Sequence, residues 1–184
     1  MSESLRLSGQ RIVVEEVRES DLDQLHDWFL ESDPQRLTCR PIEPITHPQL
    51  HARFARSSTG NASCTYAVRL LGDSRLVGRI TYFDVNPRNR SAEVGFLTGP
   101  QFRRQGYTAE ALALVLGHLF RDLNMNKVMA QTGAFNDGAI RLLLSLGFRE
   151  DGRLRRHHVL NGEYYDDVLF SLLAEEFCPD SLDP

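Results

Sequence analysis

Short runs of β-branched and aromatic residues predict four strands before Gly99. A tight turn at Gly72 separates the second run from the third, and a polar loop (NPRNR) separates the third from the fourth. Three neighbouring short strands joined in this way predict an antiparallel meander. The four runs cover residues 11–17, 64–71, 76–85 and 91–98.

One early segment places apolar residues at helical spacing. Ser20 precedes it, and acidic residues occupy its first turn, where the helix dipole favours them. We therefore expect Ser20 to cap a helix. The apolar series is Leu22, Leu25, Trp28 and Phe29.

Two further amphipathic helices are predicted within 101–120 and 136–148, where apolar residues repeat at helical period. Gly147 lies where a left-handed C-terminal cap is favoured. The segment 33–48 carries four prolines and is expected to form a loop, followed by a short helix at 49–56.

The remaining apolar runs predict a strand at 127–132 and a C-terminal hairpin. Runs at 155–160 and 163–173 flank Asn161-Gly162, a pair typical of a type I′ turn. This order of strands and helices predicts a mixed sheet with helices packed on it, an α/β or α+β fold.

The composition is that of a globular protein. With 184 residues, 41% of them apolar and 25% charged, the chain fits a single domain, 1–184, with a core of about 11–173 and a short C-terminal tail. A formal net charge of −4 argues against nucleic acid as the main partner.

Several sequence features predict a cytoplasmic protein. The N-terminus has no apolar leader, and no segment reaches the roughly 20 apolar residues that span a bilayer, so no membrane partner is expected. The three cysteines, Cys39, Cys64 and Cys178, are widely spaced, and we expect them to be reduced.

Two arginines and a glycine precede the long helix of 101–120. Gly106 lets a backbone approach a ligand closely, and Arg103 and Arg104 suit phosphate oxygens. Because a helix N-terminus offers free N–H groups and partial positive charge, the segment predicts a phosphate site. The alternative is an arginine pair on a solvated loop. The chain lacks the GKS or GKT of a Walker loop and the GxGxxG of a dinucleotide fold.

The chain resembles the GNAT superfamily of acyl-CoA-dependent N-acetyltransferases over nearly its whole length. Arg103 and Gly106 match the family's R/Q-x-x-G-x-G/A turn, and Thr108 replaces its last small residue. The segments YTAEAL, NDGAIRLLLSLGF and NGEYYDDVLFSLL resemble a subgroup that contains RimJ/RimL-like ribosomal-protein acetyltransferases and spermidine acetyltransferases. The resemblance implies a single mixed, mostly antiparallel, splayed central sheet flanked by helices.

The resemblance also implies acetyl-CoA as cosubstrate and assigns residues to it. Phe96, Leu97 and Thr98 would line the pantetheine and acetyl groups. Asn136 would bond the pantetheine arm, and it also suits a helix N-cap. The residues expected around the pyrophosphate are Arg103, Arg104, Gln105, Gly106, Tyr107 and Thr108.

Transfer of an acetyl group to an amine needs a neutral amine. Alkyl ammonium groups have a pKa of about 10, so a general base is useful near pH 7. Glu93 is the candidate base, and the alternative is that it faces solvent on an alternating strand. We expect the backbone amide of Leu97 to stabilise the oxyanion.

The general acid departs from the family pattern. Leu143 stands where many relatives have a tyrosine, and Ala139 stands where some have a serine. Alternatives are loss of the acid, protonation by solvent or by the ammonium proton, or a different donor. Tyr164 and Tyr107 are the candidate donors.

Acidic residues near the expected acceptor site would suit a cationic amine, although they also fit a solvated acidic surface. They are Asp27, Glu31, Asp33, Glu43, Asp84, Glu163, Asp166 and Asp167.

Four histidines are candidates for the site. At most one of the neighbours His157 and His158 can face the substrate, because adjacent strand residues point to opposite sides. His47 and His51 lack a third ligand, so no metal site is expected.

The sequence therefore predicts an acetyl-CoA-dependent N-acetyltransferase in which a primary amine attacks directly. The amine belongs to a polyamine, an amino sugar, or a protein or peptide N-terminus. The alternative is a regulatory or interaction module that binds acyl-CoA without turnover. The family often forms homodimers, and the sequence leaves the oligomeric state open.

Overall fold

The computed structural model describes residues 5–31, 45–57 and 63–178. Within these residues, eight strands form one sheet in the order β1-β2-β3-β4-β5-β6-β8-β7. Neighbouring strands are antiparallel except β5 and β6, which are parallel, so the predicted mixed and mostly antiparallel sheet is confirmed. The strands are β1 (Arg6–Ser8), β2 (Ile12–Glu16), β3 (Ser63–Leu70), β4 (Leu76–Asn86), β5 (Ser91–Thr98), β6 (Lys127–Gly133), β7 (Arg149–Leu160) and β8 (Glu163–Leu173).

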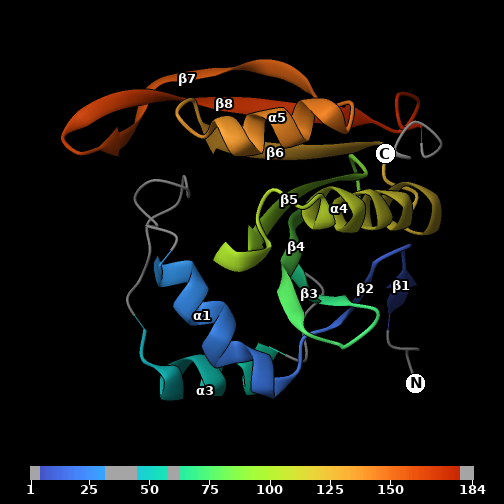
Figure 1. Ribbon diagram of the computed structural model, residues 1–184. Coiled ribbons are helices and arrows are strands. Elements are labelled where there is room, and N and C mark those ends of the chain that lie inside the picture. The colour runs from blue at the N-terminus through green and yellow to red at the C-terminus, as the bar shows by residue number, and fades with distance from the viewer. Residues whose placement is uncertain (1–4, 32–44, 58–62, 179–184) are drawn as a thin grey trace.

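Helices pack around this sheet (Figure 1). The α-helices in the described ranges are α1 (Leu22–Glu31), α3 (His47–Ser57), α4 (Tyr107–Gly117) and α5 (Asp137–Ser145). Short 3₁₀ turns cover Glu19–Asp21 and Pro100–Phe102, and α4 continues into a π-helical turn at His118–Asp122. Over the described ranges, no helix combines the length and the apolar character that crossing a bilayer requires.

Several local predictions are confirmed. The strands β3, β4 and β5 form the expected antiparallel meander, and β5 has the predicted bounds. Asn161 and Gly162 both have positive φ, 53° and 83°, as a type I′ turn requires. Gly147 also lies in the left-handed region, with φ of 87°.

The predicted cap at Ser20 is wrong. Ser20 lies inside the 3₁₀ turn Glu19–Asp21, which begins before α1. The backbone N–H of Arg18 donates to the Asp21 carboxylate over 2.8 Å, so the chain reversal is held by an acid one position later.

The sequence patterns missed β1 and the first half of β7. Residues 149–154 are charged and contain Gly152, which favoured a loop. In the structure they pair with β8, and Arg6–Ser8 pairs with β2. Pairing with the next strand along the chain decided both segments, because neither carries a strong strand pattern of its own.

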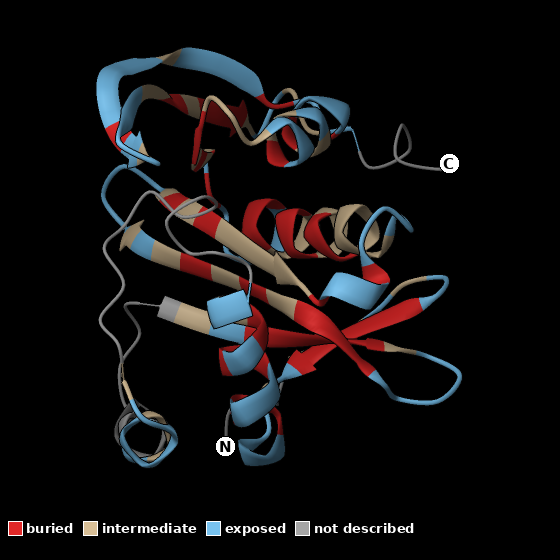
Figure 2. Ribbon diagram, turned by 60° about the vertical axis from the view of Figure 1, so that its left-hand side comes forward, coloured by how far each residue is buried: buried red, intermediate tan, exposed pale blue. Residues whose placement is uncertain are grey.

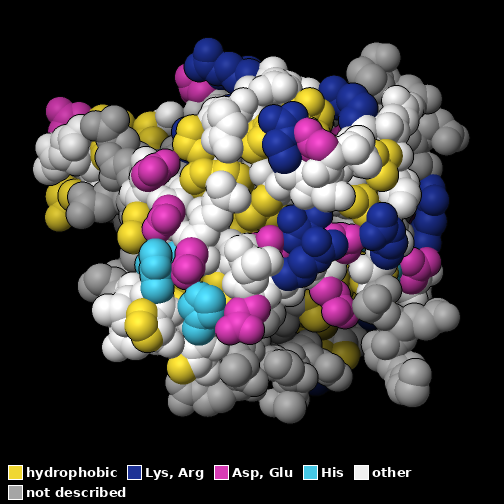
Figure 3. Space-filling view, turned by 60° about the horizontal axis from the view of Figure 1, so that its bottom comes forward, with side chains coloured by type: hydrophobic (Ala, Val, Ile, Leu, Met, Phe, Trp, Pro, Cys, Tyr) yellow, Lys and Arg dark blue, Asp and Glu magenta, His cyan; other side chains and the backbone are white. Residues whose placement is uncertain are grey.

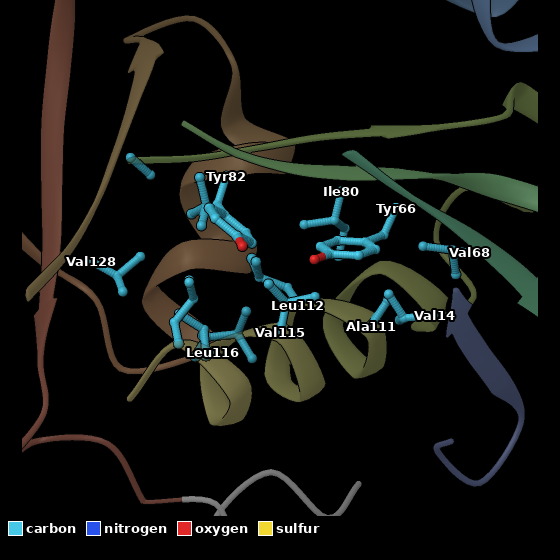
Figure 4. Close-up of a cluster of buried hydrophobic side chains, with 14 of the residues drawn as sticks. Val14, Tyr66, Val68, Ile80, Tyr82, Ala111, Leu112, Val115, Leu116 and Val128 are labelled. Carbon is cyan, nitrogen blue, oxygen red and sulfur yellow. The ribbon is translucent and has the colours of Figure 1, made fainter. Parts of the chain in front are cut away.

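The core lies between α4 and one face of the sheet (Figure 2). Figure 4 shows Ala111, Leu112 and Val115 of α4 facing strand side chains that include Ile80 and Tyr66. All of these core side chains are buried. Because strand side chains alternate, the odd-numbered neighbours of Ile80 on β4 point to the opposite face, away from α4.

The sheet separates between β5 and β6. Their parallel pairing consists of Ser91 with Lys127, Ala92 with Val128 and Glu93 with Met129. Beyond Glu93, β5 continues beside β4 and β6 continues beside β8, so the two halves of the sheet diverge (Figure 1). This divergence is the splay that the family resemblance predicts.

Candidate active site

A cavity of about 1050 Å³ lies where β5 and β6 diverge. Residues of β4, β5, β6 and α5 form most of its wall, together with Phe29 of α1 and the turn that precedes α4. The cavity therefore connects the start of a long helix with the splayed strand ends.

The turn at one end of the cavity has the conformation of an anion site. Gly106 is the N-cap of α4 with φ of 82°, and Arg104 also has positive φ, 60°. A Cβ on Gly106 would lie 3.0 Å from Nη2 of Arg11. Glycine therefore serves two needs here, because the left-handed conformation disfavours a side chain and the Arg11 guanidinium would have to shift to admit one.

Four of the six predicted pyrophosphate residues lie in the cavity wall: Arg103, Arg104, Gly106 and Thr108. The other two do not line it. The side-chain amide of Gln105 turns back and donates to the carbonyl of Gln101 over 2.8 Å.

Tyr107 is not among the residues of the described cavity wall. Its ring meets the ring of Phe102 edge to face, with centroids 6.4 Å apart, and the Arg11 guanidinium lies 5.1 Å from its centroid. Tyr107 therefore belongs to the packing that supports the turn.

Arg11 holds the turn from the start of β2, and sequence reasoning missed it. Its Nη1 donates to the carbonyl of Gln105 over 3.0 Å. Its backbone N–H and Nε donate to the Glu110 carboxylate over 2.8 and 2.9 Å. Arg11 and Glu110 are 99 positions apart, so no local pattern could have joined them.

Thr108, which replaces a small residue of the family turn, contacts the end of β5. Its hydroxyl lies 2.5 Å from that of Thr98, and Nε of Arg103 donates to the Thr98 carbonyl over 3.2 Å. These contacts tie the turn to β5, so the threonine has a structural partner here.

Asn136 has the position that both of its expected roles need. It lies in the cavity wall, and its side-chain oxygen accepts from the Ala139 N–H over 3.3 Å at the start of α5. The N-cap role is confirmed, and it leaves the amide group of Asn136 beside the cavity.

Glu93 lies in the cavity wall at the last paired position between β5 and β6. Phe96, Leu97 and Thr98 continue the wall from there toward the turn. One cavity therefore holds the Glu93 carboxylate, where β5 and β6 begin to diverge, and the anion-type turn at Gly106, before α4.

The peptide group of Leu97 faces β4. Its carbonyl oxygen would lie 2.1 Å from a Cβ on Gly78. Since the N–H and C=O of one strand residue point to the same side, the Leu97 N–H also faces β4. The N–H groups of the neighbouring residues Phe96 and Thr98 point to the other side, into the gap between β5 and β6. They, and not the N–H of Leu97, are therefore the amides of this strand segment that face the cavity.

The two tyrosines considered as general acid, Tyr164 and Tyr107, do not line the described cavity. Tyr164 is 57% exposed, with the Arg156 guanidinium 5.1 Å from its ring centroid, and neither tyrosine candidate is in the wall. Leu143, which is 1% exposed, is part of the wall. Among the described residues that form the wall there is no tyrosine.

The acids expected to attract a cationic acceptor lie elsewhere. Asp33 and Glu43 are outside the described residues, and the other six are absent from the described wall. Asp27 contacts His47, Asp166 accepts from the Arg156 N–H, and buried Asp167 accepts from Gln131. The described carboxylates in the wall are Glu93 and Asp137.

The histidines of α3 join it to α1. His51 contacts Asp23 over 2.9 Å and Glu19 over 3.1 Å, and these hydrogen bonds raise the pKa of His51. His47 contacts Asp27 over 3.1 Å. Figure 3 shows histidines beside acidic side chains on this face. No group of three metal-type ligands occurs within the described ranges.

The C-terminal histidines differ in environment. His157 is exposed, whereas His158 is buried between the Phe135 ring and Asp167, whose Oδ1 lies 3.5 Å from Nδ1 of His158. The expectation that the two point to different sides is confirmed.

Diverging central strands, with an anion-type turn and a carboxylate along the cavity between them, define an acyltransferase of the splayed-sheet class. The chain belongs to the GNAT family of N-acetyltransferases, because residues 11–149 match the family described as Acetyltransferase (GNAT) domain. Enzymes of this family use acetyl-CoA.

Individual relatives support this membership. An uncharacterized N-acetyltransferase of an SPbeta prophage in Bacillus subtilis is 33% identical over 105 residues, which are 57% of this chain and 59% of the relative. The [Ribosomal protein uS5]-alanine N-acetyltransferase of Escherichia coli is 24% identical over 185 residues, covering 95% of this chain and 94% of the relative.

A solved structure confirms the fold. Spermidine N-acetyltransferase from Vibrio cholerae, determined in complex with CoA and spermine, superposes with a TM-score of 0.82 at 21% identity. The superposition covers 90% of this chain and 96% of that one.

Proposed function

We propose that this chain transfers the acetyl group of acetyl-CoA to a primary amine by direct attack. One observation carries the proposal: a single cavity joins the Gly106 turn to Glu93 along the divergence of β5 and β6. The acceptor amine belongs to a small molecule or to a peptide or protein N-terminus.

The residues of the cavity fit coenzyme A. The amides of the turn and the start of α4 would hold the pyrophosphate, with Arg103 and Arg104 adding charge. The cavity volume of about 1050 Å³ has room for an extended cosubstrate. Peptide groups of Phe96 and Thr98 would bond the pantetheine arm, since none of the described strands pairs with β5 on that side beyond Glu93.

Acetyl-CoA supplies a thioester carbonyl and a thiol leaving group. Glu93 accepts a proton from the acceptor ammonium, directly or through water, because an amine of pKa about 10 is almost wholly protonated near pH 7. The neutral amine then attacks the thioester carbonyl, a C–N bond forms as the C–S bond breaks, and the CoA thiolate leaves and takes up a proton from solvent or from the amine nitrogen. The N–H groups of Phe96 and Thr98 are the available donors to the carbonyl oxygen as its negative charge develops.

The second candidate is a module that binds acyl-CoA without turnover. Leu143 supports it, because an apolar side chain occupies the wall where many relatives carry a tyrosine. Both candidates require CoA to bind, so turnover separates them.

The experiment follows thiol release from acetyl-CoA with peptides, polyamines, amino sugars and amino acids. Glu93→Gln should lower kcat/KM about 100-fold near pH 7, with the deficit shrinking as pH approaches the amine pKa. Calorimetry should give the same acetyl-CoA affinity for wild type and for Glu93→Gln. An unchanged rate would remove Glu93 as the base, and absence of CoA binding would overturn the proposed function.

A further inference from the structure

Arg79 is a cation in the cavity wall whose charge has no carboxylate partner among the described residues. It lies on β4 opposite Leu97 of β5. Cross-strand partners share a face of the sheet, so Arg79 and the Leu97 side chain both point away from the core that α4 covers. The described contact of the guanidinium is the Phe29 ring of α1, 5.4 Å away.

The surroundings of Arg79 are costly for a cation. Although its side chain is partly accessible through the cavity, the surrounding protein removes water from the guanidinium and lowers its pKa. Arginine nevertheless keeps its charge in proteins. A desolvated charge without a counter-charge destabilises a fold, so such a residue is expected to bind an anion that the described residues do not supply.

Arg69 on the neighbouring strand β3 is a buried arginine whose charge is paired within the chain, and it can be compared with Arg79. Its side chain is 6% exposed, and it donates to Glu15 over 2.9 Å and to Asp21 over 2.5 Å. Both partners are carboxylates of the chain. Arg79 has no such carboxylate partner in the part of the chain that the structure describes, which points to a ligand anion in place of a side-chain carboxylate.

We propose that Arg79 binds a carboxylate carried by the acyl acceptor, so that the acceptor is an amino acid-type amine. The inference rests on the proposed acetyl transfer. Arg79 is the register partner of Leu97, and β5 beside Leu97 provides the amides proposed to face the thioester. The carboxylate therefore lies within a few bonds of the attacking amine.

The phosphates of CoA are a less suitable partner for Arg79. The turn before α4 already supplies Arg103, Arg104 and the helix N-terminus for them. Arg79 is instead held against α1 by Phe29. Its planar guanidinium can stack on that ring and still present its N–H groups to a carboxylate in two parallel hydrogen bonds.

The test uses amines in matched pairs, each an amino acid and its amide, with acetyl-CoA as donor and thiol release as readout. Wild type should favour the carboxylate member in kcat/KM by about tenfold or more. Arg79→Gln should bring the ratio close to one. Arg88→Gln is the matched control, because Arg88 is exposed and outside the cavity wall, and it should keep the wild-type ratio.

Three results would overturn the proposal. The first is an equal acid-to-amide ratio in wild type and Arg79→Gln. The second is a loss of CoA affinity in Arg79→Gln by tenfold or more, which would assign the anion to the CoA phosphates. The third is a preference of wild type for succinyl-CoA over acetyl-CoA that Arg79→Gln abolishes, which would place the carboxylate on the acyl donor.

Binding measurements separate this proposal from the proposed function. If CoA binds but no amine is acetylated, N-acetylated amino acids and their amides are titrated into the CoA complex by calorimetry. Tighter binding of the acid in wild type, lost in Arg79→Gln, supports the carboxylate site, and equal binding overturns it. If CoA itself does not bind, the proposed function fails first.

Melting temperatures show whether the Arg79 variants change ligand binding or the stability of the fold. Arg79→Met removes an uncompensated cation while keeping an extended side chain, so its melting temperature should equal or exceed that of wild type. A marked fall in both Arg79→Met and Arg79→Gln would show that Arg79 supports the fold, and would overturn the assignment to a ligand.

Discussion

Two glycines of the same helical region differ in what their positions require. Gly106 has φ of 82°, and a Cβ added there would lie 3.0 Å from Nη2 of Arg11. A Cβ added to Gly117 in α4 would meet nothing within 4 Å. Gly106 is therefore set by backbone conformation and contact. Gly117 carries no such requirement, and alanine is the better helix former there.

Gly106→Ala should weaken CoA binding by an order of magnitude or more, because the added Cβ strains the left-handed cap and displaces Arg11 beside the turn. Gly117→Ala is the control, and it should keep CoA affinity and raise stability by about 0.5–1 kcal/mol. Calorimetry gives the affinities and thermal unfolding gives the stabilities. Equal affinity in the two variants would contradict a pyrophosphate site at the turn.

Residues of the candidate site differ in how visible they are from the sequence. Gly106, Asn136 and Glu93 belong to local patterns, and each was predicted and lies in the cavity wall. Arg11 and Arg79 carry no local pattern. Their importance comes from contacts with segments distant in sequence, Glu110 for Arg11 and Phe29 for Arg79.

At the scale of elements, the start of β2 and the start of α4 are coupled. Arg11 and Glu110 share two hydrogen bonds, and Arg11 also holds the carbonyl of Gln105 in the turn. The Arg11 side chain is 46% exposed, so the ion pair itself adds little stability. Its effect is expected on the conformation of the turn.

Arg11→Gln should lower CoA affinity several-fold with only a small change in melting temperature. Glu110→Gln should lower it less, since the neutral amide keeps an acceptor for the Arg11 N–H, and the double variant should be less than additive. Arg153→Gln, which breaks an exposed pair with Glu150, is the control. Strict additivity of the two changes would contradict the coupling.

Packing of α3 on α1 should depend on pH. Contacts with Asp23 and Glu19 raise the pKa of His51 above 6.5, and the His51 hydrogen bond lowers the pKa of Asp23 below 3.8. Stability from His51 is therefore fully present below pH 6.5 and is lost as pH rises through its folded pKa. Stability from Asp23 is lost as pH falls through its own lowered pKa.

Melting temperatures between pH 6 and pH 8.5 test this dependence. Wild type should lose more stability over that interval than His51→Gln, because the variant lacks the titrating imidazole. His157→Gln is the control, since His157 is exposed, and it should follow wild type. Parallel profiles for wild type and His51→Gln would contradict the assigned role of His51.

At the scale of the whole molecule, two halves of the sheet meet through the short β5–β6 pairing. One half contains β1 to β5, and the other contains β6, β8 and β7. A cosubstrate in the cavity would contact both halves, because the wall includes residues from each. Binding of the cosubstrate is therefore expected to stabilise both halves of the sheet together.

CoA at 100 times its Kd should stabilise the protein by about 2.7 kcal/mol, seen as a rise in melting temperature. Hydrogen exchange should slow in residues 94–98 of β5 and in residues 130–132 of β6 together. Protection on one half alone would contradict a cosubstrate that bridges the divergence.

The sequence by itself determined most of the helices and strands, and it determined the family. Local periodicity and turn chemistry specify the meander, α5 and the hairpin, and the Arg103–Gly106 pattern specifies an anion-type turn. These features depend on residues close together in the chain, where side-chain spacing and backbone preference act directly.

Only the tertiary structure decided the edges of the sheet, the direction of the Leu97 peptide and the surroundings of Arg79. Strand pairing fixed β1, the start of β7 and the side to which each β5 amide points. Packing placed a desolvated cation in the cavity, and it left Glu93 and Asp137 as the carboxylates of the described wall, whereas the acidic residues expected to attract a cationic acceptor are not part of it. Such properties arise from strand pairing and from packing between elements, so the local pattern of residues alone does not reveal them.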